Sequence, residues 1–199
     1  MTALVSIRGV AKRYTRGKQT VDVLQALDIA PRAAVGPVAP GSVAFFPTEV
    51  LCPGLKRLLD VRRTVGLRNP AHSLVKLMNP CEGPAIVVGS YTHPEYAHSM
   101  ADTFALRQTL AVLLRGTEGE PVADPRRCPL IEGLQQGQRL VLQPAQEGSL
   151  ATLPDLPNGQ DIQATAEYTQ AVLTGQQPVP EPLRVQVQRI AALARTSLG

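Results

Sequence analysis

The sequence predicts an α/β protein in which helices flank a mostly parallel sheet, and three observations support this class. Residues 85–114 read as a strand, an amphipathic helix and a second apolar strand, the pattern of a parallel βαβ unit. Two helical segments, 161–174 and 182–196, close the chain. Hydrophobic residues make up 44% of the 199 residues, enough for one core. We therefore expect a single α/β domain over 1–199 that ends in a helical hairpin over 161–199.

The first 46 residues contain short predicted elements. Residues 3–7 predict a strand, and 12–18 predict a basic loop. Apolar residues at helical spacing predict a short helix over 21–27. A connector rich in Pro, Gly and Ala follows over 33–42, and a small strand is expected over 43–46.

Two helices follow, over 53–65 and 70–78. Gly66 is expected to close the first helix, Asn69 to cap the second, and Pro70 to occupy its first turn. A helix start with Arg68 beside it would favour a bound anion. The residues expected to face the core are Leu55, Leu58, Leu59, Val61, Val65, Leu74, Leu77 and Met78.

The βαβ unit combines strands over 85–88 and 110–114 with a helix that ends near residue 108. Thr92 and Glu95 fit a capping box around Pro94. Ligands of parallel sheets bind beyond the carboxyl ends of the strands, here 89–93 and 115–120. Residues 120–160 look loop-rich, with a short strand at 141–142. The helix residues expected to face the core are Ala97, Met100, Ala101 and Phe104.

Positive charge is concentrated in the first part of the chain. Residues 1–76 hold 12 Lys or Arg and 4 Asp or Glu, whereas 77–199 hold 8 and 12. The stretch 61–80 contains three arginines, a lysine and a histidine but no acidic residue. With a pI of about 9.2, this distribution is typical of a protein that binds polyanions. A solvated basic face that binds nothing is the alternative, and the sequence leaves both open.

Composition also excludes several classes of protein. No apolar run is long enough to span a bilayer, and the N-terminus lacks the features of a signal peptide. The three cysteines, Cys52, Cys81 and Cys128, are odd in number and far apart, which favours free thiols over a disulfide frame or a zinc site. We therefore expect a cytoplasmic protein that does not contact membranes.

Several segments, taken in order, resemble one enzyme family. Four segments are similar to motifs of anthranilate phosphoribosyltransferase and its glycosyltransferase relatives. They are residues 20–27 (TVDVLQAL), 45–56 (FFP and PGLK at its two ends), 62–68 (RRTVGLR) and 79–80 (NP). The resemblance implies the catalytic α/β domain of that family. In those enzymes, the arginine at the position of Arg68 lies at the aromatic-acid substrate. The serine at the position of Thr20 lies at the phosphoribosyl donor.

Three other segments resemble a non-biosynthetic branch of the family more closely. They are residues 68–72 (RNPAH), 93–96 (HPEY) and 115–120 (RGTEGE). Members of that branch are described as homodimeric nucleic-acid-binding proteins. The resemblance therefore implies DNA or RNA as a partner and leaves a homodimer open.

The chain also departs from the family. The Gly-Thr-Gly-Gly-Asp loop that cradles pyrophosphate and the N-terminal helical domain have no counterpart in it. The Lys-His-Gly-Asn-Arg segment is present only as residues 7–9, with Arg8 in place of the histidine. The acidic pair that would hold Mg²⁺ falls on Pro121 and Val122, so the metal loses ligands that it needs. A natural short form and a fragment of a longer protein both remain open.

The candidate site residues are therefore mainly basic. No nucleophile or acid–base pair is evident, and we expect no cofactor. Glu118 and Glu120 are the candidate metal ligands, although a solvated turn explains them better. We expect His93 to be a loop or cap residue and His98 to be structural. For His72 and Lys76 a satisfied surface pair is favoured over contact with a ligand. The candidate nucleic-acid or phosphate-binding residues are Arg8, Lys12, Arg13, Arg16, Lys18, Thr20, Lys56, Arg62, Arg63, Arg68, His72 and Lys76.

Three hypotheses about function follow. The first is a catalytically degenerate phosphoribosyltransferase-like protein that binds nucleic acid non-specifically through its basic face. The alternative is a phosphoribosyl transferase of the tryptophan-pathway type, which would use Mg²⁺ and phosphoribosyl pyrophosphate and need a missing segment or partner chain. The third is a truncated gene remnant that folds poorly, with an exposed sheet edge that promotes aggregation.

Overall fold

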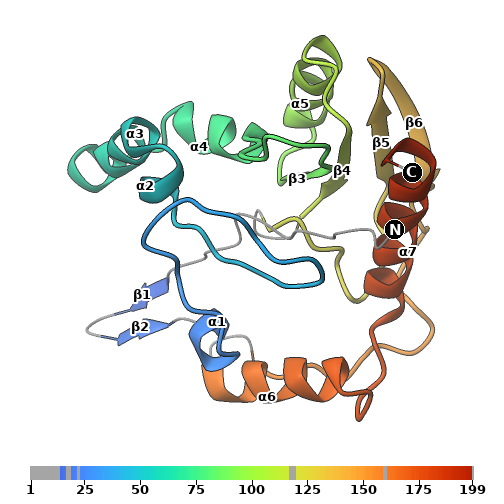
Figure 1. Cartoon of the computed structure of the whole chain (residues 1–199). Coiled ribbons are helices and arrows are strands. Elements are labelled where there is room, and N and C mark those ends of the chain that lie inside the picture. Colours follow the sequence, from blue (N-terminus) through green and yellow to red (C-terminus); the bar gives the residue numbers. More distant parts are fainter. Residues whose placement is uncertain (1–13, 17–18, 22, 117–119, 159–160, 199) are drawn as a thin grey trace.

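The computed structural model describes the chain except residues 1–13, 17–18, 22, 117–119, 159–160 and 199 (Figure 1). It confirms the predicted α/β class. The strands are β1 (Tyr14–Arg16), β2 (Gln19–Val21), β3 (Val87–Tyr91), β4 (Ala111–Arg115), β5 (Ile131–Gln135) and β6 (Gln138–Gln143). The helices are α1 (Val23–Ala26), α2 (Thr48–Leu51), α3 (Pro53–Val65), α4 (Ala71–Leu74), the 3₁₀ helix η1 (Val75–Leu77), α5 (Glu95–Leu106), α6 (Ile162–Leu173) and α7 (Glu181–Leu198).

The main sheet has the order β3-β4-β5-β6. Strands β3 and β4 pair in parallel around α5, which confirms the predicted βαβ unit. The other two pairings are antiparallel, so the expectation of a mostly parallel sheet is wrong for β5 and β6. Gln136 and Gly137 join these strands, both with positive φ, and a two-residue turn of this kind requires antiparallel strands. The strand expected at 141–142 is part of β6, but the segment expected to be otherwise loop-rich supplies half of the sheet.

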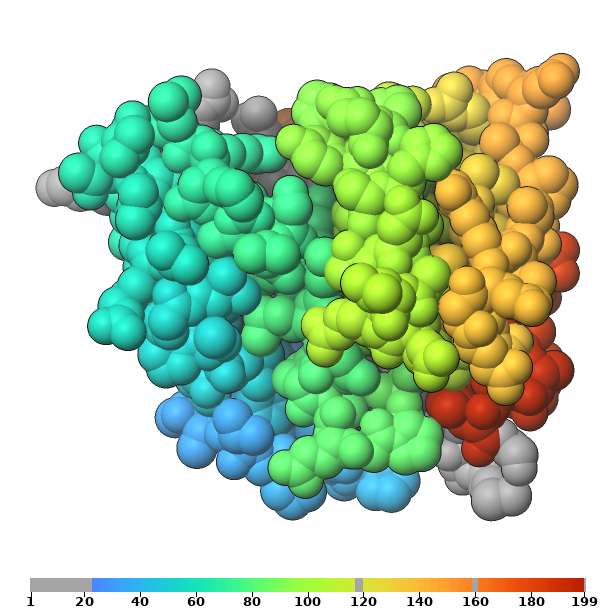
Figure 2. Space-filling model, turned by 90° about the horizontal axis from the view of Figure 1, so that it is seen from above, coloured from blue at the N-terminus to red at the C-terminus, as the bar shows by residue number. Residues whose placement is uncertain are grey.

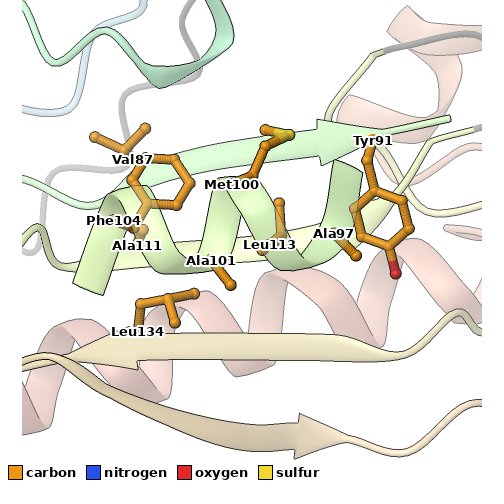
Figure 3. Packing of buried hydrophobic residues seen from close by; sticks show 9 residues of the cluster. All are labelled: Val87, Tyr91, Ala97, Met100, Ala101, Phe104, Ala111, Leu113 and Leu134. Atoms are coloured by element: carbon orange, nitrogen blue, oxygen red, sulfur yellow. The ribbon is translucent and has the colours of Figure 1, made fainter. Parts of the chain in front are cut away.

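Strand β4 is buried on both faces because α5 and α7 cover opposite sides of it. Its residues alternate, with Ala111 and Leu113 packing toward α5 and Val112 and Leu114 packing toward α7. Figure 3 shows the α5 side of this core, where Phe104 lies over the sheet. All four residues expected to point inward from α5 (Ala97, Met100, Ala101 and Phe104) are buried.

Helix α5 starts differently from the expectation. It begins at Glu95 after Pro94, and no side chain caps it, so the predicted capping box of Thr92 and Glu95 does not form. Proline at the N-cap holds a helical backbone conformation, which moves the helix start away from Thr92. His93 lies exposed in the loop before α5, as expected, and His98 lies exposed on α5.

The predicted helix over 53–65 is confirmed as α3, and Gly66 closes it in a left-handed conformation with φ of 76°. However, no residue of α3 is buried. The helix expected over 70–78 is shorter than predicted, because α4 makes one turn and continues as η1. None of the eight residues expected in the core is fully buried. Four of them are exposed (Leu58, Val61, Val65 and Leu74), and the other four are partly buried (Leu55, Leu59, Leu77 and Met78).

The remaining expectations agree in part. The strand over 3–7 and most of the basic loop over 12–18 lie outside the described residues, but β1 and β2 form an antiparallel hairpin that includes Tyr14–Arg16. Helix α1 matches the predicted short helix, and α6 and α7 match the two C-terminal helices. The small strand expected over 43–46 reduces to one bridge between Pro31 and Phe45. Among the described residues, every helix is too short or too polar to cross a bilayer.

Candidate anion-binding site

The exposed arginines of α3 and the turn after it form what we call the arginine surface, made of Arg57, Arg62, Arg63 and Arg68. Helix α3 places Arg62 and Arg63 in its last turn, where the helix dipole favours positive charge. Seen from above, α3 and the segment after it occupy one side of the molecule, with α5 in the middle (Figure 2). All four arginines are exposed to solvent.

One acidic residue offsets part of this charge. Asp60 forms ion pairs with Lys56, one turn before it, and with Arg63 at 3.4 Å. The hydrogen bond from Lys56 holds the pKa of Asp60 below its usual value. Within the described part of the chain, Arg62 and Arg68 have no ion-pair partner. The same holds for Arg57, so these three arginines are the cationic groups of α3 and its turn that are most available to an external anion.

The start of α4 does not provide the anion site expected there. The N–H group of Ala71 donates to Asn69 Oδ1 at 3.0 Å, and the N–H group of His72 donates to the carbonyl of Asn69 at 3.1 Å. Asn69 also donates from Nδ2 to the carbonyl of Leu58 at 2.6 Å, which ties α4 to α3. Because the first N–H groups are used within the chain and α4 has only four residues, the helix-start argument is wrong. Arg68 remains as a cation beside this turn.

His72 and Lys76 do not form the surface pair considered from the sequence. The His72 ring lies against Asn69, with Nδ1 3.3 Å from Oδ1. Lys76 instead reaches from η1 to the sheet, where its Nζ donates to the carbonyl of Ser90 at 3.0 Å. Burial lowers the pKa of Lys76, the charge of Arg68 lowers it further, and the charge of Glu120 opposes both. The structure thus brings Lys76 to the carboxyl end of β3.

The carboxyl ends of β3 and β4 lie together, as expected for a parallel pair. Gly116, which follows β4, donates its N–H to the carbonyl of Tyr91 at 2.9 Å. A Cβ atom at Gly116 would lie 2.3 Å from the carbonyl oxygen of Glu120 and 3.3 Å from Ser90 Oγ. The chain therefore folds back over the strand ends only because residue 116 has no side chain. We call Lys76, Ser90, Gly116 and Glu120 the strand-end site.

The strand-end site does not fit a magnesium ion. Of the two candidate ligands, Glu118 lies outside the described residues, while Glu120 is half-buried within range of the Lys76 charge. Pro121 and Val122 supply no carboxylate where the related enzymes have an acidic pair. Among the described residues, no three His, Cys, Asp or Glu side chains are grouped as a metal site. A lysine ammonium beside the one described carboxylate opposes the binding of a second cation.

The structure gives less information about the remaining candidate residues from the sequence. Arg8, Lys12, Arg13 and Lys18 lie outside the described residues. Arg16 lies in β1 and Thr20 lies in β2, and their proposed roles in binding stay predictions. Ser90 and Gly116 were missed as individual site residues, although both lie in the strand-end segments that the βαβ pattern indicated. The signal that could have found Gly116 is a glycine directly after an apolar strand.

Comparison with known proteins gives two similarities. The chain is 38% identical over 144 residues to the uncharacterized protein YbiB of Escherichia coli (strain K12), a match that covers 72% of this chain and 44% of that protein. It is 30% identical over 184 residues to anthranilate phosphoribosyltransferase of Salinispora arenicola (strain CNS-205), covering 88% of this chain and 51% of that enzyme. The chain is distantly similar to the anthranilate phosphoribosyltransferase family.

This similarity supports the resemblance drawn from the motifs at the level of the family. No family model matches the chain. The chain spans about half the length of the curated relatives that it matches. Assignment to a nucleic-acid-binding branch stays a prediction.

Proposed function

We propose that this chain is a catalytically degenerate relative of the phosphoribosyltransferases that binds nucleic acid without marked sequence preference through the arginine surface. The observation that carries the proposal is the exposure of Arg62 and Arg68 without an ion-pair partner among the described residues. They belong to a stretch of 20 residues, 61–80, that contains no acidic side chain. Cations without an ion-pair partner, exposed on a helix and on the turn after it, can form charge-assisted hydrogen bonds with the phosphate backbone of DNA or RNA.

Binding of this kind is expected to be non-specific. Contacts to phosphates position a protein on nucleic acid but carry no base information. The arginine surface is built from long side chains around one helix end, with neither an aromatic residue nor an amide side chain in α3 to contact base edges. Each neutralised phosphate releases counterions, so affinity should fall steeply as salt increases.

The test is a fluorescence-anisotropy titration of a labelled DNA duplex at about 50 mM and about 200 mM salt. Replacing Arg62, Arg63 and Arg68 with Ala should weaken binding by tenfold or more on unrelated sequences. It should also lower the slope of log K against log salt by about 2 to 3, since each phosphate contact contributes about 0.9. The matched control replaces Arg107, Arg127 and Arg195, three exposed arginines that also lack ion pairs in the described residues.

Two outcomes would contradict the proposal. One is the absence of binding at low salt by folded wild-type protein. The other is equal loss of affinity in the triple variant and its control, because net charge alone would then explain the binding. The labelled probe should include single-stranded DNA and RNA, which decides between these partners.

Transferase activity is the second candidate, and the distant similarity to a phosphoribosyltransferase favours it. In this chain alone the phosphate loop and the acidic pair are missing, so activity would need a further segment or a partner chain. Phosphoribosyl pyrophosphate with Mg²⁺ should then raise the melting temperature. No shift at millimolar ligand would remove this function from the chain by itself.

The proposal also includes a cytoplasmic location and leaves a homodimer open. Cys52, Cys81 and Cys128 are free thiols in the structure, as predicted from their spacing. Free thiols fit a reducing compartment, and we place the protein in the cytoplasm on that ground. A homodimer stays a prediction, to be tested by sedimentation of the purified chain.

A further inference from the structure

Lys76 is a cation of the stretch 61–80 whose side chain hydrogen-bonds to the sheet. Its Nζ is 3.0 Å from the carbonyl oxygen of Ser90, at the end of β3. Ser90 is only 2% exposed, and its Oγ faces the position where Gly116 has no side chain. Lys76 is itself half-buried. The lysine is therefore built into the strand-end site by a specific hydrogen bond to the sheet.

The charges around Lys76 favour an anion. Among the described residues, Arg68 and Glu120 are the charged groups that act on its ammonium, so two cations lie near one described carboxylate. Two cations near one carboxylate are more than the carboxylate can neutralise. A phosphate group at this position would interact with a partly desolvated ammonium, where such interactions are stronger than in water.

The same arrangement disagrees with the metal chemistry that the family resemblance implies. The positions of the acidic pair hold Pro121 and Val122, while Lys76 lies where its charge acts on Glu120. An ammonium bonded to a strand-end carbonyl supplies a fixed positive charge there, which is one of the roles that a divalent cation plays toward phosphate.

We propose that the strand-end site binds a phosphate group without a divalent metal ion, with Lys76 as the resident cation. The ammonium contacts the phosphate oxygens while it remains anchored near the Ser90 carbonyl, and Arg68 adds attraction from the α3 side. Glu120 limits the affinity because it repels the same ligand. The phosphate belongs either to a nucleic-acid end or to a small molecule. The inference does not depend on duplex binding by Arg62, Arg63 and Arg68 as a set.

The test measures binding of inorganic pyrophosphate by calorimetry, first in EDTA and then in excess Mg²⁺. Wild-type protein should bind in EDTA, and Mg²⁺ should weaken the interaction because it neutralises the probe. Lys76→Met, which keeps the length of the side chain, should lower affinity about tenfold or more. The control is Arg107→Met, which removes an exposed arginine at the C-terminal end of α5. Its affinity for pyrophosphate should stay within about twofold of the wild-type value.

Glu120→Gln separates this proposal from a metal site. If Lys76 is the resident cation, loss of the Glu120 charge should tighten pyrophosphate binding in EDTA severalfold. At a metal site the same change would remove a ligand and weaken binding in Mg²⁺. This variant also keeps the proposal testable if Lys76→Met does not fold, as judged by circular dichroism.

Three results would overturn the inference: pyrophosphate binding only in the presence of Mg²⁺, equal affinity in Lys76→Met and wild type, or weaker binding by Glu120→Gln. Where pyrophosphate does bind, competition identifies the source of the phosphate. Displacement by a 5′-phosphorylated oligonucleotide but not by its 5′-hydroxyl form supports a nucleic-acid end as the ligand. If neither oligonucleotide displaces pyrophosphate, the result supports a small molecule as the ligand of the same site.

Discussion

Helices α3 and α5 have similar lengths and both carry an apolar face, but they differ in what covers that face. Helix α5 buries four residues between β3, β4 and β5, and Phe104 is only 1% exposed. Helix α3 buries none, and Leu58 and Val65 are 54% and 59% exposed. An amphipathic pattern therefore predicts a helix in both cases, but it does not show that the rest of this chain covers the apolar side.

The exposed apolar residues continue beyond α3. Leu67 is 70% exposed and Leu74 is 55% exposed, so exposed apolar side chains also follow α3 in the chain, as far as α4. The charged residues of α3 are consequently held on a helix that has few tertiary contacts within the described chain. This contrast separates a well-packed sheet region from a peripheral basic region, and four predictions test it.

The largest effect is expected at Phe104. Phe104→Ala removes a buried ring that packs beside Gly89 and should lower the free energy of unfolding by about 3–5 kcal/mol. Leu58→Ala in α3 should cost less than about 1 kcal/mol because that side chain is already half in water. Urea denaturation of both variants measures the difference. Similar costs would mean that α3 is covered in solution and that the contrast between the helices is wrong.

A smaller effect is expected where the strand-end loop touches the sheet. Gly116→Ala places a Cβ atom 2.3 Å from the carbonyl oxygen of Glu120 and should destabilise the protein by about 1–3 kcal/mol. Gly83→Ala is the matched control, because nothing lies within 4 Å of its Cβ position. Thermal unfolding compares the two. A neutral Gly116→Ala would show that the loop is not held against Ser90.

The third prediction concerns pH. The pKa of Lys76 is lowered, chiefly by burial, so the ammonium loses its proton below the usual lysine value of 10.5. Pyrophosphate affinity should be complete at pH values below the lowered pKa and should decrease as pH rises through it. Pyrophosphate gains negative charge over the same interval, so a decrease reports the lysine. Calorimetry from neutral to alkaline pH measures this, and an affinity that stays constant to pH values above 10.5 would exclude Lys76 as the ligand group.

The smallest effect is expected on the apolar side of α3. Replacing Leu58, Val61 and Val65 with Gln should change the free energy of unfolding by no more than about 0.5 kcal/mol per site. Glutamine is a good helix former, so the helix itself should persist. Chemical denaturation gives the stability change, and circular dichroism gives the helix content. A cooperative loss of stability would indicate that another surface covers these residues.

The sequence by itself determined the local elements and the central unit of this protein. The bounds of α3 follow from Pro53 and Gly66, and the inward residues of α5 follow from helical periodicity, because helical hydrogen bonds and side-chain spacing depend on neighbours within a few residues. The strand-end segments were also predicted, since a βαβ unit brings the ends of its two strands to one edge.

Tertiary structure decided the features that depend on residues distant in sequence. The sequence predicted only a short strand at 141–142 in this part of the sheet, whereas the full strands β5 and β6 depend on the pairing of β5 with β4 and of β6 with β5. The exposure of Leu58 and Val65 likewise depends on what the remaining chain covers. The hydrogen bond between Lys76 and Ser90 joins residues 14 positions apart and on different elements. Periodicity shows which face of an element is apolar, but packing determines which faces contact each other. In this protein, packing placed Lys76 at the sheet and left the arginine surface in solvent.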